Sequence, residues 1–341
     1  MFQLIYFQSK EDKNYLYGMD LNENIFKIKK IMGLLSEQES SQYENNLNFC
    51  KTTYSESLFQ EAINYHKNWI LSPQFKEKIK KNNGWDDVTS NQKIKEWVSF
   101  LSEIELKYIP TFQEFEALLP QHDLSHIAAQ AFVRRQEPKK VYINCFNPKQ
   151  NQKTLKRGGI KSILIHEIQH CLDNITRANS KESINKSLNN TDTEIDVKVR
   201  GNKNIKKLSQ QLGISSSQFN KISTNLSNLV NSSGFNDQYA CSDKETMARI
   251  SGMREYYGLT NPSQKIEIKF FKDLFLKIKD LDIKKYLKRK ITDFNLSWIE
   301  SDMLFILLCW AKNGFQDFEI MINQFNDLAK QKNPNQNQNQ V

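Results

Sequence analysis

The sequence predicts a predominantly helical α+β fold with a small sheet. Apolar residues recur at helical spacing through most of the 341 residues. The clearest strand is KKVYINCFNP, residues 139–148, in which β-branched and aromatic residues run into an Asn-Pro turn. The following stretch, KSILIHEIQHCLDNI, is continuously helical from about Lys161. We therefore expect a small sheet beside a buried helix, flanked by helical regions.

Length and composition limit the classes of protein to which the chain can belong. A chain of 341 residues has room for one large domain or two ordinary ones. Its mean hydropathy is -0.65, and its longest apolar run, Met303–Trp310, is far shorter than the roughly 18 residues of a membrane span. The first residues lack the features of a classical secretory signal. We therefore expect no membrane span, and a protein that is cytoplasmic, or carried in a virion or delivered without a signal peptide.

Cysteine usage and charge give two further expectations. The five cysteines are scattered and form no CxxC pair, so we expect thiols in a reducing compartment. The net charge is +9, but the basic residues lie in mixed-charge helical stretches. Zinc-finger spacing, RNP-like motifs and GXXG loops are absent from the sequence, so a dedicated nucleic-acid partner is not expected. The cysteines are Cys50, Cys145, Cys171, Cys241 and Cys309.

The first third of the chain is expected to be helical. Residues 2–7 form either a short strand or the start of a helix. Helical spacing extends over residues 54–80, and Ser72-Pro73 ends one helix and starts the next. An amphipathic helix covers residues 91–107, and a short one covers residues 111–119.

Helices also dominate the part of the chain that follows the predicted strand and buried helix. Residues 179–190 are rich in Ser and Asn and are expected to form a loop, whereas residues 203–230 form a helical pair. Another helix begins near Ser242, where Glu245 three residues later fits a capping box. Residues 264–330 supply two or three amphipathic helices before a low-complexity, frayed end.

One motif carries the chemistry of this chain: His166-Glu167-Ile168-Gln169-His170. On a helix, residues four apart lie on one face, so both imidazoles can bind one metal ion. Glu167 can then reach a water held by the metal rather than the metal itself. Two His ligands, an open position and a carboxylate base are the arrangement of zinc hydrolases. A chance HExxH in a chain of this composition has a probability of about half a per cent; the alternative is two ordinary histidines hydrogen-bonded to their neighbours.

Zinc needs a third protein ligand, for which the sequence offers several candidates. The metzincin continuation HExxHxxGxxH is absent, since Cys-Leu-Asp-Asn follows His170. Glu245 is the first choice because it lies in the first turn of a helix, close to the small Ala248. Glu194 is the alternative third ligand, and Asp173 or a further histidine remains open.

Other side chains have candidate supporting roles. His122 and His126 are a second pair four apart, or simply a polar helix turn near the cleft. Asp173 either orients a ligand imidazole or caps the helix end. Arg249 pairs with a carboxylate or substrate carbonyl at the site, or forms a structural ion pair. Three tyrosines are candidate oxyanion donors, with core packing as the alternative for each: Tyr239, Tyr256 and Tyr257.

The strand VYIN, a short loop and the helix SILIHEIQHCLD resemble the zincin-like metallopeptidase domains of polyvalent proteins from phages and conjugative elements. The pattern of that family is a strand ending in Asn, a spacer and a helix of the form LxHEIQHxxD. The later SDKETMARISGMREYYG is similar to the Glu-x-x-Ala-Arg segment that supplies a third ligand in several such gluzincin-like proteins. The resemblance covers about residues 120–258. It implies that His166, His170 and Glu245 are ligands and that Glu167 is the general base.

We expect the chain to divide around this segment. Residues 111–260 would form the zincin-like metallopeptidase domain, with the active-site helix and a small edge sheet. A helical N-terminal region, residues 1–110, would precede it. A helical C-terminal region, residues 261–330, and a disordered tail, residues 331–341, would follow.

The expected function is zinc-dependent hydrolysis of a protein or peptide substrate. Glu167 would take a proton from the attacking water, and the substrate would lie extended beside residues 141–144. One alternative is a catalytically silent structural or assembly protein of a phage virion or mobile element. Another is a protease effector delivered into a second cell by a secretion machine.

Overall fold

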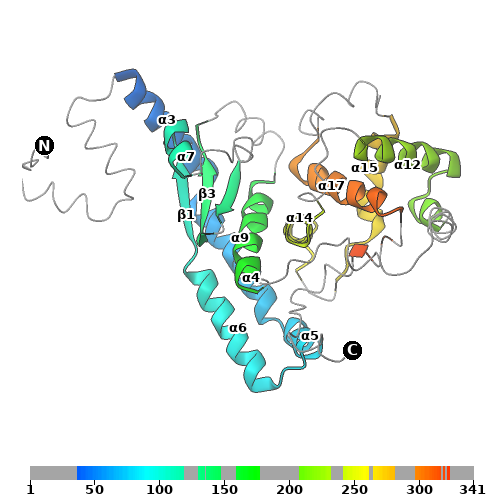
Figure 1. The fold of residues 1–341 in the computed structure, drawn as a ribbon, viewed down its shortest axis with the longest axis horizontal. Coiled ribbons are helices and arrows are strands. Elements are labelled where there is room, and N and C mark those ends of the chain that lie inside the picture. The colour runs from blue at the N-terminus through cyan, green and yellow to red at the C-terminus, as the bar shows by residue number, and fades with distance from the viewer. Residues whose placement is uncertain are drawn as a thin grey trace, which may run out of the picture.

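The computed structural model describes most of the chain outside its two ends. The described elements are mostly helices, with one three-stranded sheet, which confirms the coarse α+β prediction. They form two groups in Figure 1, with the sheet in the first and a purely helical core in the second. The described residues are 37–118, 130–134, 136–146, 159–176, 207–231, 241–260, 264–280, 296–315, 318 and 321–322.

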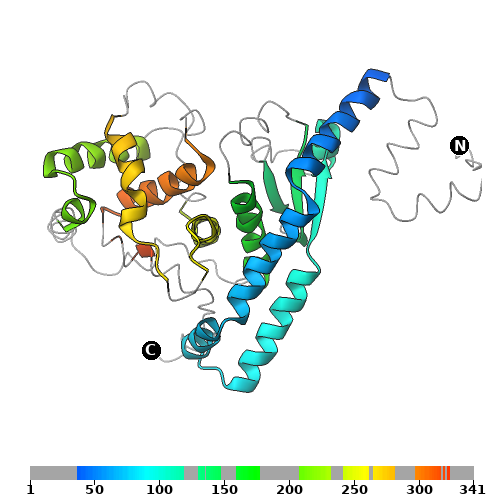
Figure 2. The same ribbon diagram turned by 180° about the vertical axis from the view of Figure 1, so that it is seen from behind.

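Four helices open the first group and follow one another along its outer side (Figure 2). Ser72 separates the second from the third and accepts a hydrogen bond from the Phe75 backbone N–H, so the predicted break is confirmed. The first helix is mostly polar and lies in the N-terminal region that is expected to be helical, although the sequence indicates no separate helix at residues 37–53. The four helices are α3 (Glu37–Thr53), α4 (Glu56–Leu71), α5 (Pro73–Asn83) and α6 (Asp87–Ser102).

The sheet has the strand order β1-β3-β2, with β1 (Glu105–Ile109), β2 (Ala131–Arg134) and β3 (Glu137–Asn144). Strand β1 pairs parallel to β3, and β2 pairs antiparallel to it. The helix predicted over residues 91–107 therefore ends too late, because pairing with β3 makes its last residues a strand. A short helix, α7 (Phe112–Leu118), follows β1, where a helix was predicted over residues 111–119.

The central position of β3 also corrects the predicted place of the substrate. Residues Val141 and Ile143 are paired with β1 on one side and with β2 on the other. A peptide cannot add beside residues 141–144, because the backbone groups on both edges of β3 are already used. An extended peptide would have to add to an outer strand.

Helix α9 (Ile160–Thr176) carries the HEIQH motif and is the buried helix that the sequence predicts. It packs on β3, on β2 and on α4. Ile163, Leu164, Ile165 and Ile168 have no exposed surface and belong to the hydrophobic core of the first group. Packing on several sides therefore fixes the position of the helix that carries the motif.

The second group is helical and has a core of its own around Trp310, Phe219 and Phe275. Residues 207–212 and α12 form the predicted helical pair, although residues 203–206 lie outside the described part of the chain. The elements of this group are α12 (Ser216–Val230), α14 (Asp243–Tyr256), the 3₁₀ turn η2 (Ile268–Phe271), α15 (Lys272–Asp280) and α17 (Trp298–Lys312).

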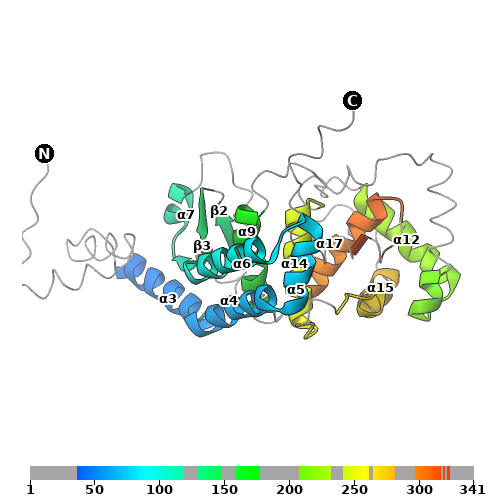
Figure 3. The ribbon, with the colours of Figure 1, turned by 90° about the horizontal axis from the view of Figure 1, so that it is seen from below.

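Helix α14 joins the two groups. It packs more extensively against α9 than against any other element, and its other contacts include α17. Figure 1 and Figure 3 both show α14 lying between these two helices. The approach to α9 is close at Gly252, where an added Cβ would lie 3.2 Å from the carbonyl oxygen of Ser162. The small residue thus lets α14 approach the motif helix.

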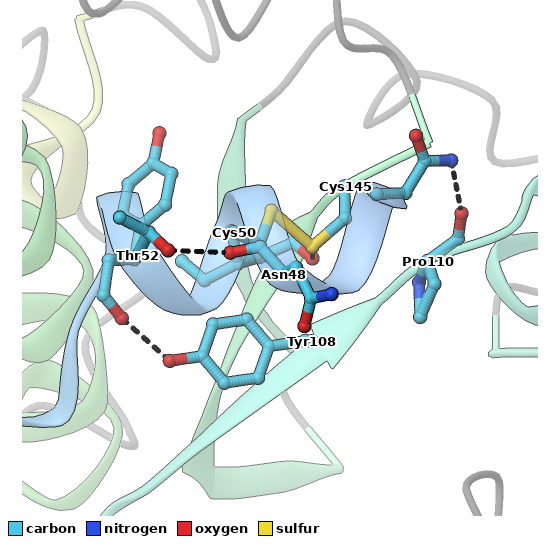
Figure 4. The surroundings of a disulfide bond; sticks show 9 residues. Asn48, Cys50, Thr52, Tyr108, Pro110 and Cys145 are labelled. Carbon is cyan, nitrogen blue, oxygen red and sulfur yellow. Dashed lines mark hydrogen bonds between the residues drawn. A yellow bond between two sulfur atoms is a disulfide. The ribbon is translucent and has the colours of Figure 1, made fainter. Parts of the chain in front are cut away.

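Two disulfides correct the expectation of free thiols. Cys50 of α3 is bonded to Cys145 just after β3, and Cys241 before α14 is bonded to Cys309 of α17. Figure 4 shows the first, which lies beside Tyr108 of β1 and Pro110. The sequence separations of 95 and 68 residues conceal this proximity, which only the folded chain creates. Cys171 is the remaining thiol and is buried.

Some expectations are not tested by the described residues. The two cores draw on residues 50–172 and 208–322, and each crosses one of the predicted boundaries after residues 110 and 260, so that division stays a prediction. The short element at residues 2–7, the loop at 179–190 and the tail at 331–341 lie outside the described part of the chain. Within that part, every helix is too short or too polar to cross a bilayer.

Candidate metal centre

The two histidines of the motif face one another on α9. His166 and His170 are four residues apart, and their Nε2 atoms are 3.2 Å from each other. The side chain of His166 is 8% exposed and that of His170 is 16% exposed, so His166 is buried and His170 is slightly more accessible to solvent. The predicted placement of both imidazoles on one helix face is confirmed.

Glu245 reaches this pair from the first turn of α14. The Ser242 hydroxyl accepts the Glu245 backbone N–H, which is one half of the predicted capping box. The Glu245 carboxylate does not return to the cap but lies 3.3 Å from His170 Nε2 and 3.8 Å from His166 Nε2. The local cap therefore sets where the helix begins, and the packing of α14 on α9 brings the carboxylate to the histidines.

The three side chains match the donor set of a metal site. Each offers one atom, and these atoms all lie within 4.8 Å of one another. Tetrahedral zinc with bonds of about 2.0–2.1 Å to nitrogen or oxygen would hold its donors about 3.3 Å apart. The separations of 3.2 Å between the two Nε2 atoms and 3.3 Å from His170 Nε2 to Glu245 agree with that value, whereas the 3.8 Å from His166 Nε2 to Glu245 Oε2 is longer. The three residues could therefore hold a metal ion, and their nitrogen and carboxylate donors are ones that zinc accepts.

Charge is distributed in this cluster as expected of a site that attracts a cation. Burial opposes a charge on His170, but the adjacent Glu245 carboxylate outweighs it and raises the His170 pKa to about 9. Burial and the neighbouring His170 charge lower the pKa of His166 to about 3. Burial opposes the charge of Glu245 also, yet His170 and Arg249 hold its pKa well below the usual range. The Glu245 carboxylate therefore stabilises a positive charge on His170, while His166 stays neutral.

Glu167 lies next to the cluster without belonging to the donor set. Its side chain is buried, and burial raises its pKa to about 7, with His170 opposing and Glu245 adding to the shift. A carboxyl group whose pKa lies near neutrality can both accept and release a proton at physiological pH. The electrostatics thus suit the general-base role that the sequence predicts for this residue.

Asp302 of α17 is the buried acidic residue that the sequence interpretation missed. Its carboxylate lies 3.9 Å from His166 Nδ1 and 3.7 Å from Arg249 Nε. Burial raises its pKa to about 7, although Arg249 opposes this. An acid in the otherwise apolar run DMLFILLCW was a detectable signal of a buried partner, but nothing local indicated that the partner would be His166.

Arg249 connects the two carboxylates. It donates a hydrogen bond to Glu245 at 3.1 Å, and its guanidinium lies over the ring of Phe305 at 4.6 Å. The expectation that it pairs with a carboxylate at the site agrees with this contact. Because Glu245 and Asp302 are both buried, the single guanidinium offsets part of the repulsion between them.

The remaining described candidates lie outside the donor set, although the charge of Asp173 adds to the raised pKa of His170. Asp173 is buried and accepts a hydrogen bond from Gln169, whose amide oxygen accepts one from Ser251 of α14. Tyr257 donates to a backbone carbonyl of η2, and Tyr256 is exposed. Four predicted residues lie outside the described part of the chain: His122, His126, Glu194 and Tyr239.

Comparison with known proteins adds no relative on which a function can be based. No protein-family model, no curated protein and no solved structure matches this chain. The case for a function therefore depends on the geometry and chemistry of the residues above.

Proposed function

We propose that the protein is a zinc-dependent peptide hydrolase with a zincin-like catalytic site. The observation that carries this proposal is the convergence of His166, His170 and Glu245, from two helices far apart in sequence, with donor distances of 3.2, 3.3 and 3.8 Å that lie near the spacing of a zinc site. Such a buried cluster of ionisable groups is costly unless a bound cation or an internal proton compensates it.

Each residue of the site has a distinct task. His166, His170 and Glu245 would hold the ion, and Arg249 keeps the Glu245 carboxylate in place. Zinc bound there would polarise the scissile carbonyl and lower the pKa of a water molecule towards about 7. Glu167 takes the proton of the attacking water and passes it to the leaving amine, as its pKa of about 7 allows.

The test separates metal binding from catalysis. Purified full-length protein is expected to bind one zinc ion and to cleave members of a peptide library. Glu167→Gln should keep the zinc but lose about 10²–10⁴-fold in cleavage rate, because only the base is removed. His170→Ala should lose both zinc and cleavage. Zinc content is measured by elemental analysis and cleavage by mass spectrometry.

A control lies elsewhere in the chain. Glu96→Gln changes an exposed glutamate of α6 and should leave zinc content and cleavage unchanged. Wild type that holds zinc but cleaves nothing would favour the silent structural or assembly protein. Wild type that binds no zinc would end the proposal.

The disulfides bear on where such an enzyme works. Disulfides persist in oxidising settings, which include cell surfaces and virions. The two bonds at Cys50–Cys145 and Cys241–Cys309 therefore favour a virion-carried or delivered protein over one that stays in a reducing cytoplasm.

A further inference from the structure

The side of His166 that faces away from the proposed metal has an unused polar atom. Its Nδ1 is buried and makes no hydrogen bond among the described residues. The same is true of Asp302 Oδ2, which lies 3.9 Å away on α17. Two buried polar atoms, a donor and an acceptor by chemical type, thus face one another at slightly more than hydrogen-bond distance.

The other oxygen of Asp302 is held in place by the site itself. Arg249 Nε lies 3.7 Å from Asp302 Oδ1, and the same guanidinium donates to Glu245 at 3.1 Å. Its face rests on Phe305, one turn after Asp302. The carboxylate is buried, with Oδ1 near Arg249 and Oδ2 near His166.

Metal binding decides which proton His166 carries. An imidazole that binds a metal through Nε2 must carry its proton on Nδ1, and a buried N–H needs an acceptor. A shift of about 1 Å would bring Nδ1 and Oδ2 to the usual 2.9 Å of such a bond. Asp302 is positioned to be that acceptor.

We infer that Asp302 is a positioning residue that fixes His166 for metal binding by accepting a hydrogen bond from its Nδ1–H; this rests on the proposed metal function. The carboxylate sets the tautomer and the direction of the ring, and it strengthens the ligand. The residue comes from α17, beyond the segment with the zincin-like resemblance. The C-terminal helices therefore take part in the site rather than merely flanking it.

The test measures zinc affinity and the tautomer of His166 in the full chain. In the zinc-loaded wild type, labelled with ¹⁵N-histidine, we expect His166 as the Nδ1–H form with a hydrogen-bonded proton. Asp302→Leu should weaken zinc binding about 10–100-fold in competition with a chromophoric chelator and should abolish that proton signal. Asp302→Asn should lie between, because an amide oxygen still accepts but carries no charge.

Asp173→Asn is the matched control, since Asp173 is also buried but accepts from Gln169. It should leave the His166 proton signal unchanged. Zinc-loaded wild type with His166 in the Nε2–H form would overturn the inference, and this measurement needs no variant to fold. An Asp302→Leu protein that binds zinc as tightly as wild type would also overturn it. Wild type without zinc would instead remove the proposed function, and this inference with it.

Discussion

At the scale of single residues, the site depends on a carboxylate that contacts another helix instead of capping its own. Glu245 is the third residue of its helix and would ordinarily close a capping box with Ser242. Its carboxylate instead meets two histidines and an arginine, and charge-assisted contacts of this kind are stronger than a neutral cap. His66 shows the opposite case, because its Nε2–H donates to the Ile165 carbonyl oxygen at 3.0 Å and it contributes nothing to the metal cluster.

His66 should make the stability of the fold depend on pH. Burial lowers its pKa from 6.5 to about 4 in the folded chain. The unfolded chain therefore binds the proton more readily, so the free energy of unfolding falls as pH drops from about 6.5 towards about 4. The loss amounts to about 3 kcal/mol in total.

Denaturant unfolding at several pH values, in the presence of a chelator, measures this effect. His66→Gln keeps an amide donor for Ile165 but cannot titrate. The wild type should lose stability more steeply than this variant as the solution is acidified. Parallel curves for the two proteins would contradict the role assigned to His66.

At the scale of elements, the contact between α9 and α14 assembles the donors. The two helices approach closely where Gly252 faces the backbone of Ser162. Glu245 lies on the same helix, seven residues earlier and therefore about two turns away. The position of that carboxylate thus depends on how closely the helices pack.

Gly252→Val should push the two helices apart. The added branches would meet the Ser162 carbonyl, so we expect a loss of about 1–3 kcal/mol in unfolding free energy. Zinc affinity should fall as well, because Glu245 moves away from the histidines. Chemical denaturation and chelator competition measure the two effects.

Ser99→Val is the control, since it places the same side chain at an exposed position of α6. Serine and valine differ little in helix propensity, so this variant shows the effect of adding valine at an exposed helix position. If Gly252→Val retained wild-type zinc affinity, the close approach of the helices would not matter to the site.

At the scale of the whole molecule, two disulfides and two cores hold the parts that carry the site. Cys241–Cys309 ties the beginning of α14 to α17, so it links the helix of Glu245 to the helix of Asp302. Cys50–Cys145 ties α3 to the end of β3. Of the helices around the cluster, α14 and α17 are thus joined by a covalent bond, whereas α9, which carries both histidines, is held by packing.

The two disulfides predict how many cysteine thiols will react with a thiol reagent. Protein refolded under oxidising conditions and then denatured should expose one thiol, Cys171, to a thiol reagent, and all five cysteines after reduction. Cys309→Ser should lower the free energy of unfolding by about 2–5 kcal/mol, as expected when a long loop is no longer closed. Cys171→Ala should bring the unreduced count to zero. Five reactive thiols before reduction would show that the bonds do not form.

The sequence by itself determined the helical character of the chain, the break at Ser72-Pro73, the buried HEIQH helix and the pairing of His166 with His170. These follow from local periodicity and from residue types that act within one or two turns. Only the tertiary structure decided that residues 105–109 form a strand, that cysteines far apart in sequence are bonded, and that Asp302 lies beside His166. Each of these depends on contacts between distant segments, whose energies appear only when the chain packs. Glu245 depends on both levels. Its residue type and its place near a helix N-cap could be read from the sequence, but its contact with the histidines required α14 to pack on α9.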